Sequence, residues 1–157
     1  MRKVLFGGSF DILHGNHLDI LKIAKTFGDY LVVAIANDGR IRGKKHPALP
    51  IFEAEERKKL IEHLDMVDEA YVIYDKPENN VIFKALKLIQ PDVYVRTEEV
   101  NPIDEKAERK LCKELGIEMK IIPRFSHPNF KSSSKIIKYI LENFKLEDMN
   151  KLIKKDE

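Results

Sequence analysis

The sequence predicts an α/β protein in which helices cover both faces of a five-stranded parallel sheet, as in a three-layer sandwich. Short apolar runs alternate with helical stretches along the 157 residues, which is typical of a parallel sheet flanked by helices. The run Tyr30 to Ala36 is apolar almost throughout, as expected of a strand covered on both faces. The length suits one domain with a sizeable core. We assign residues 1–144 to this domain and 145–157 to a C-terminal helical tail.

The first part of the chain begins with a predicted strand at Lys3 to Phe6, which runs into a pair of glycines. Apolar residues at helical spacing predict a helix from His17 to Phe27, and Gly28 ends it. The strand Tyr30 to Ala36 follows. The polar connection from Asn37 to Pro50 has no predicted structure of its own, and connections of this length are usually functional or mobile.

The rest of the chain continues the alternation. Acidic residues in the first turn support a helix at Phe52 to Leu64, because the helix dipole favours negative charge there. Pro91 and Gly116 end two of the later helices. The remaining predicted elements are the strand Ala70 to Tyr74, the helix Val81 to Ile89, the strand Asp92 to Val95, the helix Pro102 to Leu115, the strand Met119 to Ile122 and the helix Ser132 to Phe144.

The charge and composition argue against several classes of protein. A formal net charge of +2 excludes a nucleic-acid-binding protein that relies on overall basicity. No apolar run approaches the roughly 18 residues that span a bilayer, and the chain opens directly on a strand, so we expect neither a membrane segment nor a signal peptide. The single cysteine, Cys112, excludes an internal disulfide and favours a cytoplasmic location.

The strongest functional signal lies between the first strand and the first helix, where residues 7–17 read Gly-Gly-Ser-Phe-Asp-Ile-Leu-His-Gly-Asn-His. Ligands of open α/β sheets bind at the carboxyl ends of the strands, so phosphate chemistry is expected here. Glycines let the backbone approach a ligand, and the helix start offers free amides to an anion. His14 and His17 would both reach one polyphosphate and stabilise the charge that develops on it. Taken alone, the two histidines could instead cap and pack the helix, or bind zinc, although no cysteine or third histidine has suitable local spacing.

These residues resemble the nucleotidyltransferase superfamily with the H-x-G-H signature, over nearly the whole core from Arg2 to about Leu141. Gly8-Ser9-Phe10-Asp11 matches the G-[ST]-F-D pattern of that superfamily, and His14 and His17 match its histidines. The second strand and the segments Glu56-Arg57 and Val67-Asp68-Glu69 are similar to those of glycerol-3-phosphate cytidylyltransferase. Other members are heptose-phosphate nucleotidyltransferases, archaeal FAD synthetase and pantetheine-phosphate adenylyltransferase. The resemblance implies a Rossmann-like fold and a homodimer.

The signature departs from the family pattern at one position. The family usually has glycine directly before the second histidine, whereas this sequence has Gly15 followed by Asn16. Asparagine tolerates unusual backbone angles better than most residues, so the turn can survive. A side chain at this point alters the pocket that the nucleotide enters.

A second motif, Ser132-Ser133-Ser134-Lys135-Ile136, resembles the I-S-[ST]-[ST]-x-I motif at the start of the last helix of the family. The resemblance implies that these hydroxyls and the free amides of the helix hold phosphates, helped by Arg124. From the residues alone, the alternative is an ordinary N-cap with additional serines.

The basic connection holds further candidates. Lys44 and Lys45 resemble family lysines that contact the triphosphate or the acceptor phosphate, and Arg57 resembles an arginine on the acceptor side. The alternative for each lysine is a solvated surface position. Arg96 stands where related enzymes have a glycine-aspartate pattern that recognises the nucleotide, and it either grips a substrate or pairs with the nearby Glu98 or Glu99.

The resemblance implies transfer of a nucleotidyl group, with CMP favoured, from a nucleoside triphosphate to a small phosphorylated alcohol or sugar. Pyrophosphate is released, and Mg²⁺ is carried on the triphosphate. The alternatives are an ATP-dependent adenylyltransferase acting on FMN, pantetheine phosphate or a heptose phosphate, and a non-catalytic nucleotide-binding protein of the same fold. We expect no nucleic acid, no membrane and no protein-bound metal.

This reading assigns three roles to the residues. The assigned residues are His14, His17 and Lys45 for catalysis; Gly8, Ser9, Phe10, Asp11, His14, His17, Arg124, Ser132, Ser133 and Ser134 for binding the nucleotide; and Asp11, Lys44, Lys45 and Arg57 for binding the acceptor.

Overall fold

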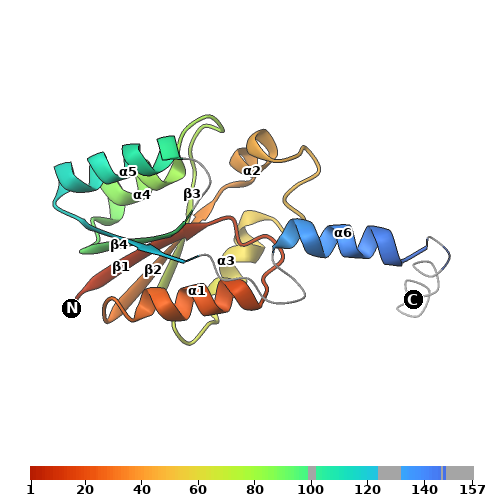
Figure 1. The fold of residues 1–157 in the computed structure, drawn as a ribbon, viewed down its shortest axis with the longest axis horizontal. Helices are drawn as coiled ribbons and strands as arrows, with labels where there is room; N and C mark the ends of the chain where they lie inside the picture. Colours follow the sequence, from red (N-terminus) through yellow and green to blue (C-terminus); the bar gives the residue numbers. More distant parts are fainter. Residues whose placement is uncertain (99–101, 124–131, 146, 148–157) are drawn as a thin grey trace.

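The computed structural model describes residues 1–98, 102–123, 132–145 and 147. Five parallel strands form one sheet in the order β3-β2-β1-β4-β5, with helices on both faces (Figure 1). The predicted Rossmann-like three-layer sandwich is therefore confirmed. The strands are β1 (Lys3–Gly8), β2 (Tyr30–Ala36), β3 (Glu69–Ile73), β4 (Val93–Thr97) and β5 (Glu118–Ile122). The helices are α1 (Gly15–Lys25), α2 (Asp38–Lys44), α3 (Ala54–Glu62), α4 (Val81–Ile89), α5 (Pro102–Leu115) and α6 (Ser133–Asn143).

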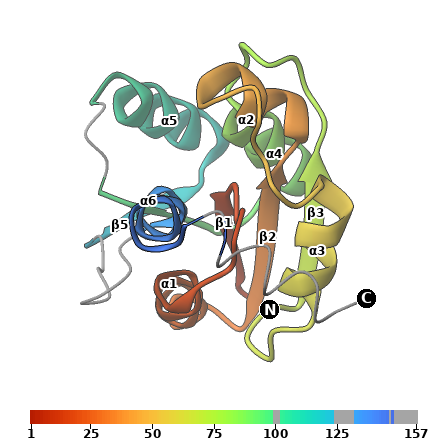
Figure 2. The same ribbon diagram turned by 90° about the vertical axis from the view of Figure 1, so that its right-hand side faces the viewer.

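The sheet separates two apolar cores. Alternate residues of β1 point to opposite faces, so Val4 packs with side chains of α1 and α3 while Leu5 packs with side chains of α2, α4 and α5. Figure 2 shows the two groups of helices on opposite sides of the strands. Because the strand order reverses at β1, the carboxyl ends of β1 and β4 lie at the topological switch point, where ligands of such sheets bind.

The helix α2 corrects the prediction that the connection from Asn37 to Pro50 has no structure of its own. The Asn37 side chain caps this helix by accepting a hydrogen bond from the Arg40 amide at 2.8 Å. Its amide nitrogen also donates to the carbonyls of Ile73 (3.1 Å) and Asp75 (2.9 Å), which ties α2 to the end of β3. Ile41 is buried against the sheet. The basic residues of the connection are therefore carried by a packed helix.

Two other boundaries differ from the predicted ones. The strand β1 continues through both glycines to Gly8 rather than ending at Phe6. The helix α1 begins at Gly15 with His14 as its N-cap, two residues before the predicted start at His17. Both changes shorten the connection between β1 and α1, which is left with residues 9–14.

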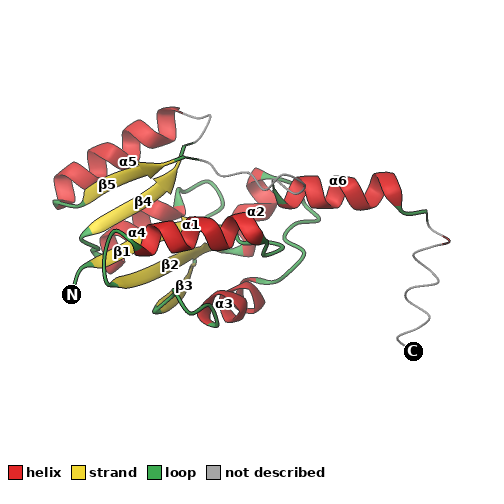
Figure 3. Cartoon of the chain, turned by 60° about the horizontal axis from the view of Figure 1, so that its bottom comes forward, coloured by secondary structure: helices red, strands yellow, loops and turns green. Residues whose placement is uncertain are grey.

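The helix α6 projects away from the sheet, as Figures 1 and 3 show from two directions. None of its described residues is buried. The predicted helical tail falls almost wholly outside the described residues, and the expected homodimer stays a prediction. Across the described ranges, no helix has the length and apolar character needed to cross a bilayer.

Candidate active site

Two histidines stack at the N-terminus of α1, directly after the carboxyl end of β1. The rings of His14 and His17 lie with their centroids 3.8 Å apart and an interplanar angle of 29°. The backbone N–H of His14 donates to Nδ1 of His17 at 3.3 Å. Since Nδ1 accepts, the neutral imidazole of His17 carries its proton on Nε2, where it is a donor for a ligand.

Burial keeps both imidazoles neutral in the structure as it stands. Burial, followed by the charges of His14 and Lys45, lowers the pKa of His17 from 6.5 to about 3. Burial also lowers the pKa of His14. Within the described part of the chain, Nδ1 of His14 is the one buried side-chain nitrogen or oxygen that has no hydrogen-bond partner. Buried polar atoms without partners are rare, and this one lies in the capping turn that joins His14 to His17 at the start of α1.

The lowered pKa predicts that the protein loses stability in mild acid. The unfolded chain binds a proton at His17 below about pH 6.5, whereas the folded chain does so only near pH 3. The free energy of unfolding therefore falls as the pH drops through this window, by up to about 1.4 kcal/mol per pH unit from this group. Melting temperatures measured from pH 7 to pH 4.5 should show a shallower acid slope for His17→Phe than for the wild type, with exposed His63→Asn as the control. Identical slopes for His17→Phe and the wild type would contradict the assignment.

Phe10 supports the histidine pair from behind. Its ring is buried and lies 5.3 Å from the His17 ring and 6.2 Å from the Phe6 ring, measured between centroids. A Cβ on Gly8 would stand 2.9 Å from Cε2 of Phe10, so the ring requires glycine there. Phe10 and Ile12 have positive φ angles of 53° and 57°, which are uncommon for residues other than glycine and costly for a β-branched one. Phe10 therefore packs against and positions the His17 ring, and its predicted contact with a nucleotide stays a prediction.

Asn16, the departure from the family signature, is buried in the first turn of α1. It is not among the described residues with positive φ, so the turn does not depend on an unusual backbone angle at this position. Gly15, in contrast, is exposed. The exchange of the two middle residues of the signature thus leaves the helix start intact.

Asp11 and Arg57 have structural partners that the sequence did not indicate. The Asp11 carboxylate is buried and accepts hydrogen bonds from the amides of Ile51 (2.9 Å) and Phe52 (3.0 Å), which close the connection between α2 and α3. The structure thus gives Asp11 a structural role, and its contact with the nucleotide or the acceptor stays a prediction.

The Arg57 side chain, predicted to bind the acceptor, is fully buried at 0% exposure. Its guanidinium donates to the carbonyls of Ala36 (2.9 Å), Phe52 (2.9 Å) and Ser9, and pairs with Asp38 at 2.6 Å. Each of its three nitrogens has a partner and the side chain has no exposed surface, so the structure gives Arg57 a structural role, and its contact with an acceptor stays a prediction. Arg57 holds the backbone of the loop after β1 at a fixed distance from β2 and α2.

The serine motif lies against the histidine turn. Ser132 caps α6 by accepting from the Lys135 amide at 3.4 Å, and the Ser133 hydroxyl donates to the backbone carbonyl of Asp11. The structure thus joins two motifs that lie far apart in the sequence, as the prediction of a shared phosphate site requires. Arg124, the predicted helper of these serines, lies outside the described residues.

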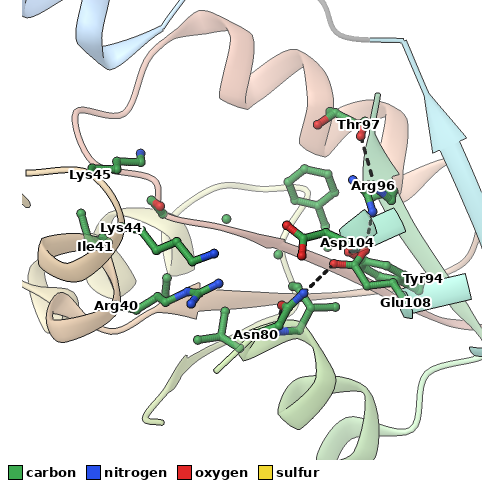
Figure 4. A pocket seen from close by; sticks show the side chains of 17 residues that line it. Arg40, Ile41, Lys44, Lys45, Asn80, Tyr94, Arg96, Thr97, Asp104 and Glu108 are labelled. Atoms are coloured by element: carbon green, nitrogen blue, oxygen red, sulfur yellow. Dashed lines mark hydrogen bonds and ion pairs between the residues drawn. The ribbon is translucent and has the colours of Figure 1, made fainter. Parts of the chain in front are cut away.

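Beside the histidine turn, a cleft of 330 Å³ opens over the carboxyl ends of β1 and β4 (Figure 4). Its lining includes Gly8 and Ser9 of the turn, together with the predicted phosphate-binding residues Lys44 and Lys45. Lys45 also acts electrostatically on His17, whose pKa it lowers. Lys45 is therefore shared between the cleft and the surroundings of His17. The sequence did not single out the other polar lining residues Arg40, Asn80, Tyr94, Asp104 and Glu108 as site residues.

Arg96 lies in the floor of this cleft but has a different partner from the ones predicted. It is buried and pairs through Nη1 with Glu108 of α5 at 2.7 Å, a partner that the sequence did not suggest, while Glu99 lies outside the described residues. Glu108 stands one helical turn after Asp104 on α5. An i, i+4 pair of carboxylates on one helix face is the signal that would have pointed to this side of the cleft.

The described residues contain no cluster of three or more histidine, cysteine or acidic side chains that could hold a metal ion. Cys112 is buried, and burial raises the pKa of its thiol to about 11. The cysteine therefore offers neither a metal ligand nor a reactive thiolate near neutral pH.

Comparisons with known proteins place the chain in a family of nucleotidyltransferases. The model of the cytidylyltransferase-like family matches residues 5–139. The chain is 35% identical over 143 residues to a protein of Ferroglobus placidus named FAD synthase, covering 90% of this chain and 89% of that protein. It is 36% identical over 143 residues to one of Thermococcus kodakarensis with the same name, covering 90% and 93%.

Solved structures give the same architecture. A protein of Thermoplasma volcanium, described as a lipopolysaccharide core biosynthesis protein, superposes with a TM-score of 0.60 at 33% identity, covering 78% of this chain and 95% of that one. Pantoate-beta-alanine ligase from Francisella tularensis superposes with a TM-score of 0.60 at 17% identity over 98% of this chain and 78% of that one, which is a likeness of fold alone.

Proposed function

This chain belongs to the cytidylyltransferase-like family and is a nucleotidyltransferase, and from this premise we propose that it transfers AMP from ATP to FMN, forming FAD and pyrophosphate. Two observations support this choice over transfer of CMP to a small alcohol or sugar phosphate, which the sequence favoured. The relatives that match about nine-tenths of the chain are named FAD synthase. The cleft beside the histidines also has room for a large acceptor.

The size and charge of the cleft support a large phosphorylated acceptor. Pockets that hold a drug-sized ligand measure roughly 300 to 1,000 Å³, and this one measures 330 Å³. A three-carbon phosphate would leave much of that space to water. Arg40, Lys44 and Lys45 line the side next to the histidine turn, where a phosphate monoester is held by charge.

The single geometric observation that supports phosphoryl transfer at this cleft is that Lys45 belongs both to the cleft and to the surroundings of His17. A phosphate bound at the lysines therefore lies beside the group that faces the reacting triphosphate. An oxygen of the acceptor phosphate attacks the α-phosphorus of ATP, the bond from that phosphorus to the bridging oxygen breaks, and pyrophosphate leaves. No protein nucleophile is needed, because such transfers depend on positioning and on electrostatic stabilisation.

The residues act on this reaction through hydrogen bonds and charge. Nε2–H of neutral His17 is a donor for an α-phosphoryl oxygen, where it stabilises the negative charge that develops in the reaction. The hydrogen bond from Ser133 to Asp11 holds the start of α6 beside the histidine turn. The free amides of that helix start can bind the outgoing pyrophosphate, because helix N-termini favour anions. Mg²⁺ fits as a companion of the triphosphate, whose charge it neutralises, because it commonly keeps its waters and binds mainly through substrate phosphates.

The test is pyrophosphate release with ATP and CTP separately, against FMN, pantetheine phosphate, a heptose phosphate and glycerol 3-phosphate, with magnesium present. We expect turnover with ATP and FMN, with FAD identified by chromatography, and none when riboflavin replaces FMN. Riboflavin is the matched control because it differs only in the phosphate that must attack. Turnover with CTP and glycerol 3-phosphate, and none with ATP and FMN, would overturn the proposal.

A further inference from the structure

We propose that the α5 side of the cleft, formed by Asn80, Asp104 and the Glu108 network, recognises the body of the acceptor and orients its phosphate toward the histidines. The inference rests on the proposed function in one respect, which is that the cleft takes the phosphorylated acceptor. It adds the residues that select this acceptor and the chemical groups that they read.

The two sides of the cleft carry opposite charge. Figure 4 shows Arg40 and Lys44 reaching in from α2 and Asp104 facing them from α5. Burial lowers the pKa of Arg40, and the negative charge of Asp104 partly opposes this effect, so the two sides act on each other across the cleft. A phosphate is attracted to the α2 side and repelled from the α5 side. A phosphorylated molecule therefore has one favourable direction of entry, with the phosphate at the lysines.

The α5 side is held rigid by the hydrogen bonds of Glu108, which is 5% exposed. Its Oε2 accepts from Nη1 of Arg96 at 2.7 Å and from the Tyr94 hydroxyl at 3.0 Å. Its Oε1 accepts from Nδ2 of Asn80 at 3.0 Å. Asn80 is also fixed at its other end, because its Oδ1 caps α4 by accepting from the Ile82 amide at 3.0 Å. Side chains locked in this way lose little freedom when a ligand binds.

The chemistry of this side defines the class of ligand. Carboxylate oxygens accept hydrogen bonds, so the acceptor body must present donors, either hydroxyl groups or ring N–H groups. A purely apolar body would remove water from the Asp104 carboxylate without offering it a hydrogen-bond donor, and would bind poorly. Phosphorylated sugars and polyols satisfy this requirement, and so does FMN through the hydroxyls of its ribityl chain and the imide N–H of its ring.

Asp104→Asn is the principal test, because it keeps the shape of the side chain and removes its charge. Asn80→Ser is the second variant, since serine is also a good N-cap and keeps α4 intact while removing the amide. Glu105→Gln is the matched control: it lies next to Asp104 on α5, outside the cleft lining, where it pairs with Arg109 at 2.9 Å. Melting temperatures within the range of the control establish that each variant folds.

The readout is the dissociation constant, measured by calorimetry without turnover, for FMN, ribose 5-phosphate, inorganic phosphate and ATP. For Asp104→Asn we expect FMN and ribose 5-phosphate to bind roughly tenfold more weakly, as for loss of a hydrogen bond to a charged group. Inorganic phosphate should bind as well as before or more tightly, because a nearby negative charge is gone, and ATP should be unaffected. Asn80→Ser should also weaken the binding of FMN and ribose 5-phosphate.

Unchanged FMN and ribose 5-phosphate affinities in both folded variants would overturn the inference. An equal loss of affinity for inorganic phosphate would also overturn it. So would a wild-type protein that binds FMN and ribose 5-phosphate no more tightly than inorganic phosphate. Failure of the proposed function would give a different result from failure of this inference. If the wild type makes no FAD but binds ribose 5-phosphate through Asp104, the acceptor is another phosphorylated polyol, and the inference holds.

Discussion

His17→Ala should lower the turnover number for pyrophosphate release by roughly 10²- to 10³-fold, the usual cost of losing one preorganised donor to a developing negative charge. Nε2–H of His17 is such a donor, because His14 N–H fixes Nδ1 as the acceptor. The measurement is kcat at saturating ATP and acceptor. Truncating the ring also removes its contact with Phe10, so circular dichroism and the melting temperature must accompany the kinetics.

Two further substitutions sharpen this test of His17. His63→Ala is the control, because His63 is exposed and its Nδ1 lies 2.7 Å from the Lys59 carbonyl, away from the cleft. His17→Gln retains an N–H donor and should recover part of the lost rate. A folded His17→Ala protein with kcat within threefold of the wild type would refute the role of His17 in catalysis.

Arg57→Met should destabilise the fold by about 3 to 5 kcal/mol, the typical cost of breaking a buried ion pair by removing one partner. The variant leaves the carbonyls of Ser9, Ala36 and Phe52 without their donor and Asp38 without its counter-charge. For a chain of this size the melting temperature should fall by roughly 10 °C or more, as measured by differential scanning calorimetry.

The matched control for Arg57 is Arg109→Met, which removes an exposed arginine from an i, i+4 pair with Glu105. It should change the melting temperature by no more than about 2 °C. A direct role in acceptor binding would give the opposite pattern for Arg57→Met, with an unchanged melting temperature and a raised KM for the acceptor. That result would return Arg57 to the role that its place in the sequence motif suggested.

The order and type of most elements could be predicted because their apolar patterns agree with their burial. The strand β2 reads as buried on both faces and is so, and α4 has an apolar face bounded by Asn80 and Pro91. The helix α2 could not be found in this way. Its sequence, Asp-Gly-Arg-Ile-Arg-Gly-Lys, has two glycines and one apolar residue, so local propensity argues against a helix. What stabilises α2 is tertiary: Nδ2 of Asn37 donates to the carbonyls of Ile73 and Asp75, and a Cβ on Gly43 would stand only 3.1 Å from Cβ of Pro77.

The candidate site was predictable to the extent that it lies on contiguous motifs. The histidine pair lies within one short motif, and the serines at the start of α6 form another. The structure brings the two motifs together through the hydrogen bond from Ser133 to Asp11. The α5 side of the cleft is different, because Glu108 meets Arg96 and Asn80 only after β4 and α5 have packed. Asp11 and Arg57 matched the family motif, but only the structure reveals that their polar atoms are taken up by the backbone.

The strand order has a consequence for how the site is assembled during folding. The contact between the starts of β1 and β2, from Arg2 to Asp29, joins residues 27 positions apart. The contact between the starts of β1 and β4, from Lys3 to Asp92, joins residues 89 positions apart. Closing the longer loop costs about 1 kcal/mol more in chain entropy. A folding chain that has joined only β1, β2 and β3 already carries the histidine turn, but the wall that faces it across the cleft is missing. The histidine turn and the wall that faces it across the cleft thus depend on contacts of different sequence separation, and the wall forms only when the more distant contacts are made.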